Sequence, residues 1–210
     1  MIIAVDGPTA SGKGTIAKAL ADHYGLPFLD TGLLYRAVGF QLLQNGGNPD
    51  SPDDAFEACV FSDDILEQPE LRDEAIGGLA SRVSVHPEVR AALNKRQVDF
   101  AHQPGGALLD GRDIGTVIAP DADVKLFITA SANVRAERRY REMKSRGVNV
   151  EFETILADIQ ARDARDAGRT TAPLKPAVDA IEIDTSNMSV HTAILSAVTA
   201  VDRQVTASRA

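Results

Sequence analysis

The 210-residue chain is predicted to fold as one three-layer α/β domain around a parallel sheet of about five strands, on three observations. Short apolar runs alternate with longer segments of helical spacing, as in proteins whose parallel strands are joined by crossover helices. Hydrophobic residues make up 44% of the chain and charged residues 25%, which is an ordinary globular balance. The length suits one domain with a small inserted subdomain.

The expected strands are short apolar runs, most of them without polar alternation. Such runs are typical of strands that are buried on both faces of a sheet. The expected strands cover residues 1–6, 27–29, 107–109, 124–129 and 180–184.

Helical spacing predicts helices between these strands. Asp30 before Thr31 is a typical N-cap, and Pro87 suits the first turn of a helix. The polar stretch 50–75 carries no hairpin signal, so we expect helix and loop there, as an insertion rather than core. The expected helices cover residues 13–23, 31–43, 54–65, 72–85, 87–102, 132–146, 151–166 and 190–203.

Composition and charge argue against several classes of protein. The net charge of −8 disfavours binding to a nucleic-acid polymer. No run approaches the roughly 20 apolar residues that span a bilayer, and the N-terminus lacks the basic region of a signal peptide. We therefore expect a cytoplasmic protein without a membrane partner. A single cysteine, Cys59, rules out an internal disulfide or a cysteine-based zinc cluster.

A glycine-rich segment joins the first strand to the first helix. Its sequence, Gly7-Pro-Thr-Ala-Ser-Gly-Lys-Gly-Thr15, contains the G-x-x-x-x-G-K pattern of a phosphate-binding loop, or P-loop. Glycines let successive backbone N–H groups point at phosphate oxygens, and the helix N-terminus adds its positive end. The predicted ATP-binding residues are Gly7, Pro8, Thr9, Ala10, Ser11, Gly12, Lys13, Gly14 and Thr15.

Three residues of this loop have specific expected roles. Lys13 is expected to reach the β- and γ-phosphates as a mobile point charge. Thr15 is expected to help hold Mg²⁺, directly or through water. Gly14 replaces the Ser or Thr that most often follows the lysine, and the resulting G-K-G-T ending is typical of nucleoside monophosphate kinases.

Four further motifs, read together with the P-loop, resemble a known family. They are D-T-G-x-x-Y-R at 30–36, H-P-x-V-R at 86–90, D-G-R-D-I-G-T at 110–116 and R-D-x-R-D at 162–166. Because these motifs occur in this order, the chain resembles the bacterial-type cytidylate kinases over nearly its whole length. The resemblance implies a P-loop fold with a helical lid, and direct in-line transfer of the γ-phosphate of ATP to CMP, and also to dCMP, with Mg²⁺ as cofactor.

The resemblance also assigns residues to the acceptor. Ser81, Arg90 and Asp113 match the base pocket, where Asp113 would accept a hydrogen bond from the amino group of cytosine. Uracil has a carbonyl at that position, so CMP should be preferred over UMP. The full set of predicted CMP-binding residues is Thr31, Arg36, Ser81, Arg90, Arg112, Asp113, Arg162, Asp166 and Arg169.

Within this set, the phosphate and the sugar of CMP are matched by different residues. Arg36, Arg112 and Arg169 match ligands of the CMP phosphate, and Arg162 and Asp166 match residues that contact the sugar. Arg162, Arg165 and Arg169 fall at i, i+3 and i+7, which places them on one helix face, with Asp163 and Asp166 interleaved. An ordinary solvated face with ion pairs is therefore an alternative, and it weighs most for Arg162.

Arginines also crowd residues 135–146, and the resemblance makes 138–149 a mobile lid over ATP. Arg138 and Arg139 are candidates for stabilising charge on the transferring phosphoryl group, although a solvated basic helix is the alternative. Asp110 ends the strand expected beside the first strand, so it is a second candidate for holding Mg²⁺ or its waters. The predicted catalytic residues are Lys13, Arg112, Arg138 and Arg139.

The resemblance further suggests how the chain is divided. The core would cover about 1–44, 105–130 and 170–210, the monophosphate-binding region about 31–104, and the lid about 138–149. Many family members carry a small antiparallel sheet where this chain has the stretch 50–75, so we expect a shortened insert. We expect a monomer. Two alternatives stay open: a kinase that uses UMP or AMP, and a nucleotide-dependent binding switch without transfer activity.

Overall fold

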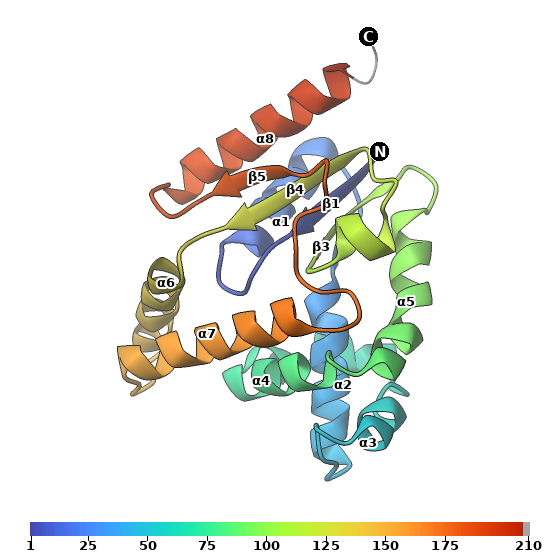
Figure 1. The fold of residues 1–210 in the computed structure, drawn as a ribbon, viewed down its shortest axis with the longest axis vertical. Helices are drawn as coiled ribbons and strands as arrows, with labels where there is room; N and C mark the ends of the chain where they lie inside the picture. Colours follow the sequence, from blue (N-terminus) through green and yellow to red (C-terminus); the bar gives the residue numbers. More distant parts are fainter. Residues whose placement is uncertain (208–210) are drawn as a thin grey trace. The chain divides into compact units, whose positions relative to one another are not determined.

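A computed structural model describes residues 1–207 of the chain and confirms the α/β class (Figure 1). Its five strands form one sheet in the order β2-β3-β1-β4-β5. The pairs β1–β3, β1–β4 and β4–β5 are all parallel. The strands are β1 (Ile2–Asp6), β2 (Phe28–Asp30), β3 (Ala107–Gly111), β4 (Val124–Thr129) and β5 (Ile181–Asp184).

The order of the strands reverses at β1, which makes this strand the topological switch point of the sheet. From β1 the chain first builds β2 and β3 on one side and then crosses to β4 and β5 on the other. In register, Asp6 lies opposite Gly111 of β3 and Phe127 of β4, so the carboxyl ends of these three strands meet at one edge. Open parallel sheets bind their ligands at such a switch point, outside the carboxyl ends of the strands.

The chain forms two compact units, one from Met1–Leu29 and the described residues from Ala101 onward, the other from Asp30–Phe100. In the first unit, α1 and α8 pack against each other and against the sheet (Figure 1). Their small and aliphatic side chains share one core cluster with Ile3 and Val5 of β1. The helices of this unit are α1 (Lys13–Tyr24), α6 (Ala132–Ser145), α7 (Phe152–Gly168) and α8 (Val190–Ala207), with one π-helical turn at Ile114–Ile118.

The second unit is helical and has a core of its own, formed mainly around α2. Asp30 caps α2 as expected, because its side chain accepts a hydrogen bond from the Gly32 N–H at 2.9 Å. A Cβ on Gly39 of α2 would lie 3.0 Å from the Cβ of Leu79, so this glycine lets α2 and α4 approach closely. The helices are α2 (Thr31–Gln44), α3 (Pro52–Glu57), α4 (Glu74–Val83) and α5 (Pro87–Ala101), with 3₁₀ turns at Asp63–Glu67 and Pro69–Arg72.

The helix expected over 54–65 was wrong beyond residue 57. The helix α3 ends there, and a separate 3₁₀ turn begins at Asp63. Cys59 and Phe61 both pack against the cluster around Leu34 and Val38. Side chains two residues apart cannot share one face of an α-helix, so this packing requires an open backbone. The absence of strands from 50–75, all of which the structure describes, was expected.

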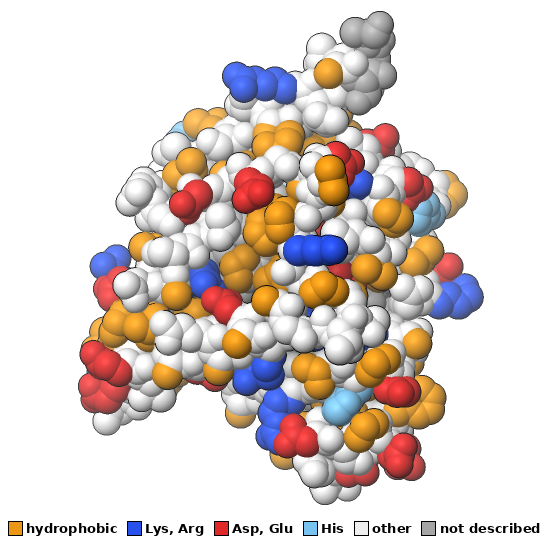
Figure 2. Space-filling model, viewed as in Figure 1, with side chains coloured by type: hydrophobic (Ala, Val, Ile, Leu, Met, Phe, Trp, Pro, Cys, Tyr) orange, Lys and Arg blue, Asp and Glu red, His pale blue; other side chains and the backbone are white. Residues whose placement is uncertain are grey.

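Figure 2 shows acidic and basic side chains interspersed on one face of the molecule. None of the helices that the structure describes is long and apolar enough to cross a membrane.

Candidate active site

The P-loop leaves the carboxyl end of β1 and wraps back to the first turn of α1. A Cβ on Gly7 would collide with the backbone carbonyl of Ile128, so only glycine fits there. Ala10 and Gly12 both adopt the left-handed region, with φ of 58° and 89°. Gly12 is the N-cap of α1 and has no side chain to cap the helix. The N-terminus of α1 therefore has no side-chain cap, and its positive end suits an anion.

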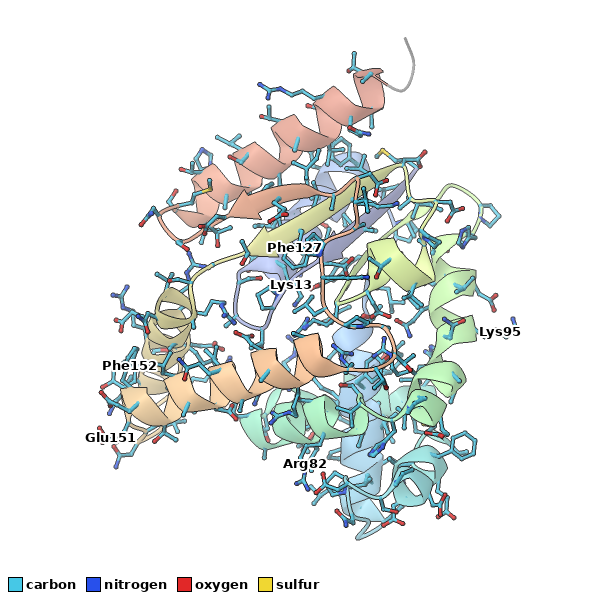
Figure 3. The ribbon with its side chains drawn as sticks, viewed as in Figure 1. Lys13, Arg82, Lys95, Phe127, Glu151 and Phe152 are labelled. Atoms are coloured by element: carbon cyan, nitrogen blue, oxygen red, sulfur yellow. The ribbon has the colours of Figure 1, made fainter. Side chains whose placement is uncertain are left out.

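Lys13 begins α1 and lies near the carboxyl ends of the central strands (Figure 3). Its Nζ is 3.3 Å from Oδ1 of Asp110, whose side chain is only 4% exposed. A Cβ on Gly14 would lie 3.2 Å from Oδ2 of the same carboxylate. The glycine that departs from the commonest P-loop pattern therefore keeps side-chain atoms away from Asp110. The expected position of the Asp110 strand beside β1 is confirmed.

The side-chain oxygen atoms at this edge of the sheet fit Mg²⁺ rather than a metal whose ligands all come from the protein. In the part of the chain that the structure describes, no group of three or more His, Cys, Asp or Glu side chains could hold a metal ion. Mg²⁺ needs no such group, because it usually keeps several waters and binds through one or two carboxylates and the substrate phosphates. Asp110 and the exposed Thr15 supply oxygen atoms of the right kind, and their use as Mg²⁺ ligands stays a prediction.

Three predicted acceptor residues form a bonded group in the first unit. The Asp166 carboxylate accepts hydrogen bonds from Nε of Arg112 at 3.0 Å and from Nη2 of Arg169 at 2.9 Å. The Arg169 side chain is 2% exposed and that of Asp166 is 10% exposed. A solvated ion-paired face is therefore ruled out for Asp166 and Arg169. Their contact with CMP stays a prediction.

Arg162 lies on the same helix, α7, and is also buried. Its Nε is 3.0 Å from the carboxylate of Asp158, one turn earlier in the helix. The pairing with Asp158 is the kind of contact that the structural alternative describes. A role of Arg162 at the sugar therefore stays open.

Four further acceptor residues belong to the second unit, and Arg36 and Arg90 are two of them. Nη1 of Arg36 donates to the carbonyl oxygens of Leu71 at 2.6 Å and Asp73 at 3.0 Å, which holds the guanidinium in place. The guanidinium of Arg90 lies 5.5 Å from the ring centroid of Tyr35, in cation–π geometry, and is buried. Both arginines are thus oriented by their own unit before any ligand binds.

Two further predicted residues of this unit sit on its helices. Thr31 is the buried first residue of α2, and Ser81 is a half-buried residue of α4. Their contact with CMP stays a prediction.

The arginines of α6 differ in what they contact. Arg139 pairs with Glu142 in the next turn at 2.7 Å. Arg138 instead reaches back to the P-loop, where Nη1 lies 3.3 Å from the carbonyl oxygen of Ser11. Arg135 also contacts the loop, at the Thr9 carbonyl oxygen, and pairs with Asp163 of α7. The solvated basic helix is thus ruled out for Arg135 and Arg138, and lid closure stays a prediction.

Sequence reasoning missed Asp6, the last residue of β1. It is 5% exposed, and its two carboxylate oxygens accept hydrogen bonds of 2.8 Å from the N–H groups of Ile114 and Gly115. These bonds fix the start of the π-helical turn directly after Asp113, which is itself buried. A carboxylate that ends an otherwise apolar strand was the available signal, since such a group needs partners at the strand end.

Burial raises the pKa of Asp6 to about 7, and the nearby carboxylates of Asp113 and Asp110 add to the rise. The two N–H donors from Ile114 and Gly115 oppose it, so burial has the larger effect. The folded chain thus binds more protons at this group than the unfolded chain does, between about pH 4 and pH 7.

The pKa of Asp6 predicts a pH dependence of stability. Because the folded-state pKa is raised, this group lowers the free energy of unfolding as pH rises through that window. The test compares the free energy of unfolding of the wild type with that of Asp6→Asn. The wild-type value minus the Asp6→Asn value should be larger at pH 5 than at pH 8, by more than about 1 kcal/mol. Urea unfolding of both proteins at the two pH values measures this. A difference that is the same at both pH values would contradict the raised pKa.

A glycine-rich loop between a buried parallel strand and a helix, with a lysine facing the carboxylate of the adjacent strand, defines a P-loop nucleotide-binding protein. A family model described as cytidylate kinase matches residues 3–203 of the chain. The chain therefore belongs to the cytidylate kinase family, and the expected enzyme class is confirmed.

Individual proteins that are similar to this chain are cytidylate kinases as well. The cytidylate kinase of Caulobacter sp. (strain K31) is 55% identical over 194 residues, which cover 91% of this chain and 89% of that protein. The cytidylate kinase of Xanthobacter autotrophicus (strain ATCC BAA-1158 / Py2) is 52% identical over 202 residues, covering 96% and 97%.

Solved structures of lower identity share the fold. An uncharacterized protein from Eubacterium ventriosum ATCC 27560 superimposes with a TM-score of 0.55 at 19% identity, covering 97% of this chain and 98% of that chain. A gluconokinase from Sinorhizobium meliloti 1021 gives a TM-score of 0.53 at 17% identity, covering 96% and 91%. At these identities the likeness concerns the fold alone, and it agrees with the expected P-loop fold.

Proposed function

We propose that this chain transfers the γ-phosphate of ATP to CMP, giving ADP and CDP, and that it also accepts dCMP. The observation that carries the proposal is the group of Arg112, Asp166 and Arg169. One largely buried carboxylate accepts hydrogen bonds from two guanidinium groups and holds them side by side. A guanidinium binds phosphate oxygens through two parallel N–H bonds, which suits the monophosphate of the acceptor.

Donor binding is assigned to the P-loop. Its N–H groups and the start of α1 would hold the phosphates of ATP, and Lys13 would place its charge on the β- and γ-phosphates. When bound, Mg²⁺ would supply further positive charge at these phosphates, held by Asp110 and Thr15 directly or through water. Arg138 and Arg139 would add charge near the transferring group.

Catalysis in this proposal needs no general base. The attacking group is a phosphate oxygen of CMP, which is already anionic near neutral pH. The chain therefore acts by aligning donor and acceptor, neutralising charge and excluding water, which would otherwise receive the phosphoryl group. Closure of residues 138–149 over ATP would exclude the water.

Base recognition is assigned to Ser81, Arg90 and Asp113. An arginine and a serine can donate to the ring nitrogen and carbonyl of cytosine, while Asp113 accepts from its amino group. Arg36 would join the phosphate ligands, and Thr31 would contact the bound CMP. A carboxylate oxygen has two lone pairs, so Asp166 can hold its arginines and still accept from a ribose hydroxyl, with Arg162 beside it.

The proposed partners are small molecules only. The interspersed surface charges and the net charge of −8 support nucleotide substrates over a nucleic-acid polymer. We propose that the enzyme works as a monomer in the cytoplasm.

A panel of acceptors tests the proposed function. We expect ADP formation from ATP, measured in a coupled assay, to be fastest with CMP and dCMP and at least tenfold slower per enzyme with UMP and AMP. A preference for UMP or AMP would favour the alternative acceptor. No ADP formation with any of the four would favour a binding switch without transfer activity.

A further inference from the structure

Thr185 follows the last residue of β5 and is 2% exposed. Its Oγ1 lies 2.9 Å from the carbonyl oxygen of Ser11 in the P-loop and 3.1 Å from that of Thr129 at the end of β4. The same oxygen accepts a hydrogen bond of 3.0 Å from Nη1 of Arg138 on α6. One hydroxyl therefore meets the P-loop, the sheet and α6 at a single buried point.

The backbone of Thr185 strengthens this junction. Its N–H donates to the Thr129 carbonyl at 2.8 Å, which continues the strand pairing of β5 with β4 by one residue. Its carbonyl accepts from Nη2 of Arg138 at 2.6 Å. The hydroxyl is thus held at a fixed place by the sheet, and the Arg138 guanidinium is gripped by both the side chain and the backbone of one residue.

The contact of Thr185 with the Ser11 carbonyl fixes the orientation of the next peptide group in the P-loop. The Ser11 carbonyl receives donors from Thr185 at 2.9 Å and from Arg138 at 3.3 Å. Because a trans peptide is planar, its C=O and N–H groups point in opposite directions. Holding the Ser11 carbonyl toward Thr185 therefore fixes the Gly12 N–H to point away from it. Gly12, with φ of 89°, is the N-cap of α1, where a phosphate is expected to bind.

We infer that Thr185 is a positioning residue of the donor site, whose hydroxyl sets the orientation of the Ser11–Gly12 peptide and holds Arg138 beside the P-loop. The inference rests on the proposed use of the P-loop for ATP. Without the hydroxyl, the Ser11 carbonyl loses its shorter donor and Arg138 loses one acceptor. The loop would then sample other peptide orientations, and ATP would have to select the competent one at a cost in affinity.

Three variants test this role with a change of one group each. Thr185→Val keeps the size and branching of the side chain and removes the hydroxyl. Thr185→Ser keeps the hydroxyl and removes the methyl group. Thr199→Val is the matched control, because Thr199 is exposed on α8 and its hydroxyl donates to the Leu195 carbonyl of its own helix, at 2.8 Å.

Two readouts separate positioning from general stability. We expect Thr185→Val to raise the Kd for ADP, measured by calorimetry, and the KM for ATP by about tenfold, which is the size of one buried hydrogen bond. The KM for CMP should change less than twofold, Thr185→Ser should stay within about threefold of wild type, and Thr199→Val should match it. If Thr185→Val shows no cooperative thermal transition, Thr185→Ala is measured in its place.

Two results would overturn the inference: a KM for ATP and a Kd for ADP that stay within twofold of wild type in Thr185→Val, or a parallel rise in the KM of both substrates. The ADP measurement involves no acceptor. A wild type that binds ADP yet makes no CDP would therefore refute the proposed function while Thr185 is still tested. A wild type that binds no ADP would overturn both.

Discussion

Lys13→Ala is expected to lower kcat for CMP phosphorylation by about a thousandfold or more, since charge neutralisation is the main source of catalysis in phosphoryl transfer. The Nζ of Lys13 lies 3.3 Å from the Asp110 carboxylate, and Lys13 begins the helix that follows the P-loop. Alanine leaves the phosphates without this point charge. The measurement is the initial rate with saturating ATP and CMP.

The same substitution leaves the buried Asp110 carboxylate without its Lys13 partner, so we expect some loss of stability as well. Thermal unfolding separates that loss from the loss of activity. Lys18→Ala is the matched control, because Lys18 is an exposed lysine of the same helix. A folded Lys13→Ala protein with near-normal turnover would contradict the assigned donor site.

Asp113→Ala is expected to reduce the preference for CMP over UMP by about tenfold to a hundredfold. An aspartate carboxylate accepts from the cytosine amino group and faces the uracil carbonyl without a proton between them, so its removal penalises CMP and relieves UMP. Asp113 is 4% exposed, so its interactions are not screened by water. The measurement is the ratio of kcat/KM for the two acceptors.

A control and a second substrate make the Asp113 result specific. The KM for ATP should change less than the acceptor ratio does. Asp121→Ala removes an exposed carboxylate of the same unit that contacts His102, and it should leave the ratio unchanged. If the ratio is also unchanged in Asp113→Ala, Asp113 does not belong to the base pocket.

Much of the fold could be predicted because the signals are local. The strand at Val124–Thr129 was expected with the same bounds, and the Asp30 cap of α2 follows from the residue type and its place before a helical pattern. The break after residue 57 could not be predicted, because it depends on where Cys59 and Phe61 pack rather than on local propensity.

The candidate active site shows the same contrast between local signals and contacts that depend on the assembled fold. Asp166 and the Arg169 that follows the end of α7 are three positions apart, so their pairing could be anticipated from spacing, whereas Arg112 reaches Asp166 across 54 positions. Asp6 bonds backbone groups 108 and 109 positions away, and Thr185 reaches Ser11 across 174. Motifs identify which residue types chemistry needs, but such long-range hydrogen bonds exist only once the sheet has assembled.

The most direct measurement of the central claim is a phosphorus NMR spectrum of ATP, CMP and Mg²⁺ incubated with the enzyme. Transfer to CMP predicts signals of CDP and ADP that grow in equal amounts while the CMP signal falls, with little inorganic phosphate. ADP that forms together with inorganic phosphate while CMP stays constant would contradict the account, because the γ-phosphate would then have gone to water.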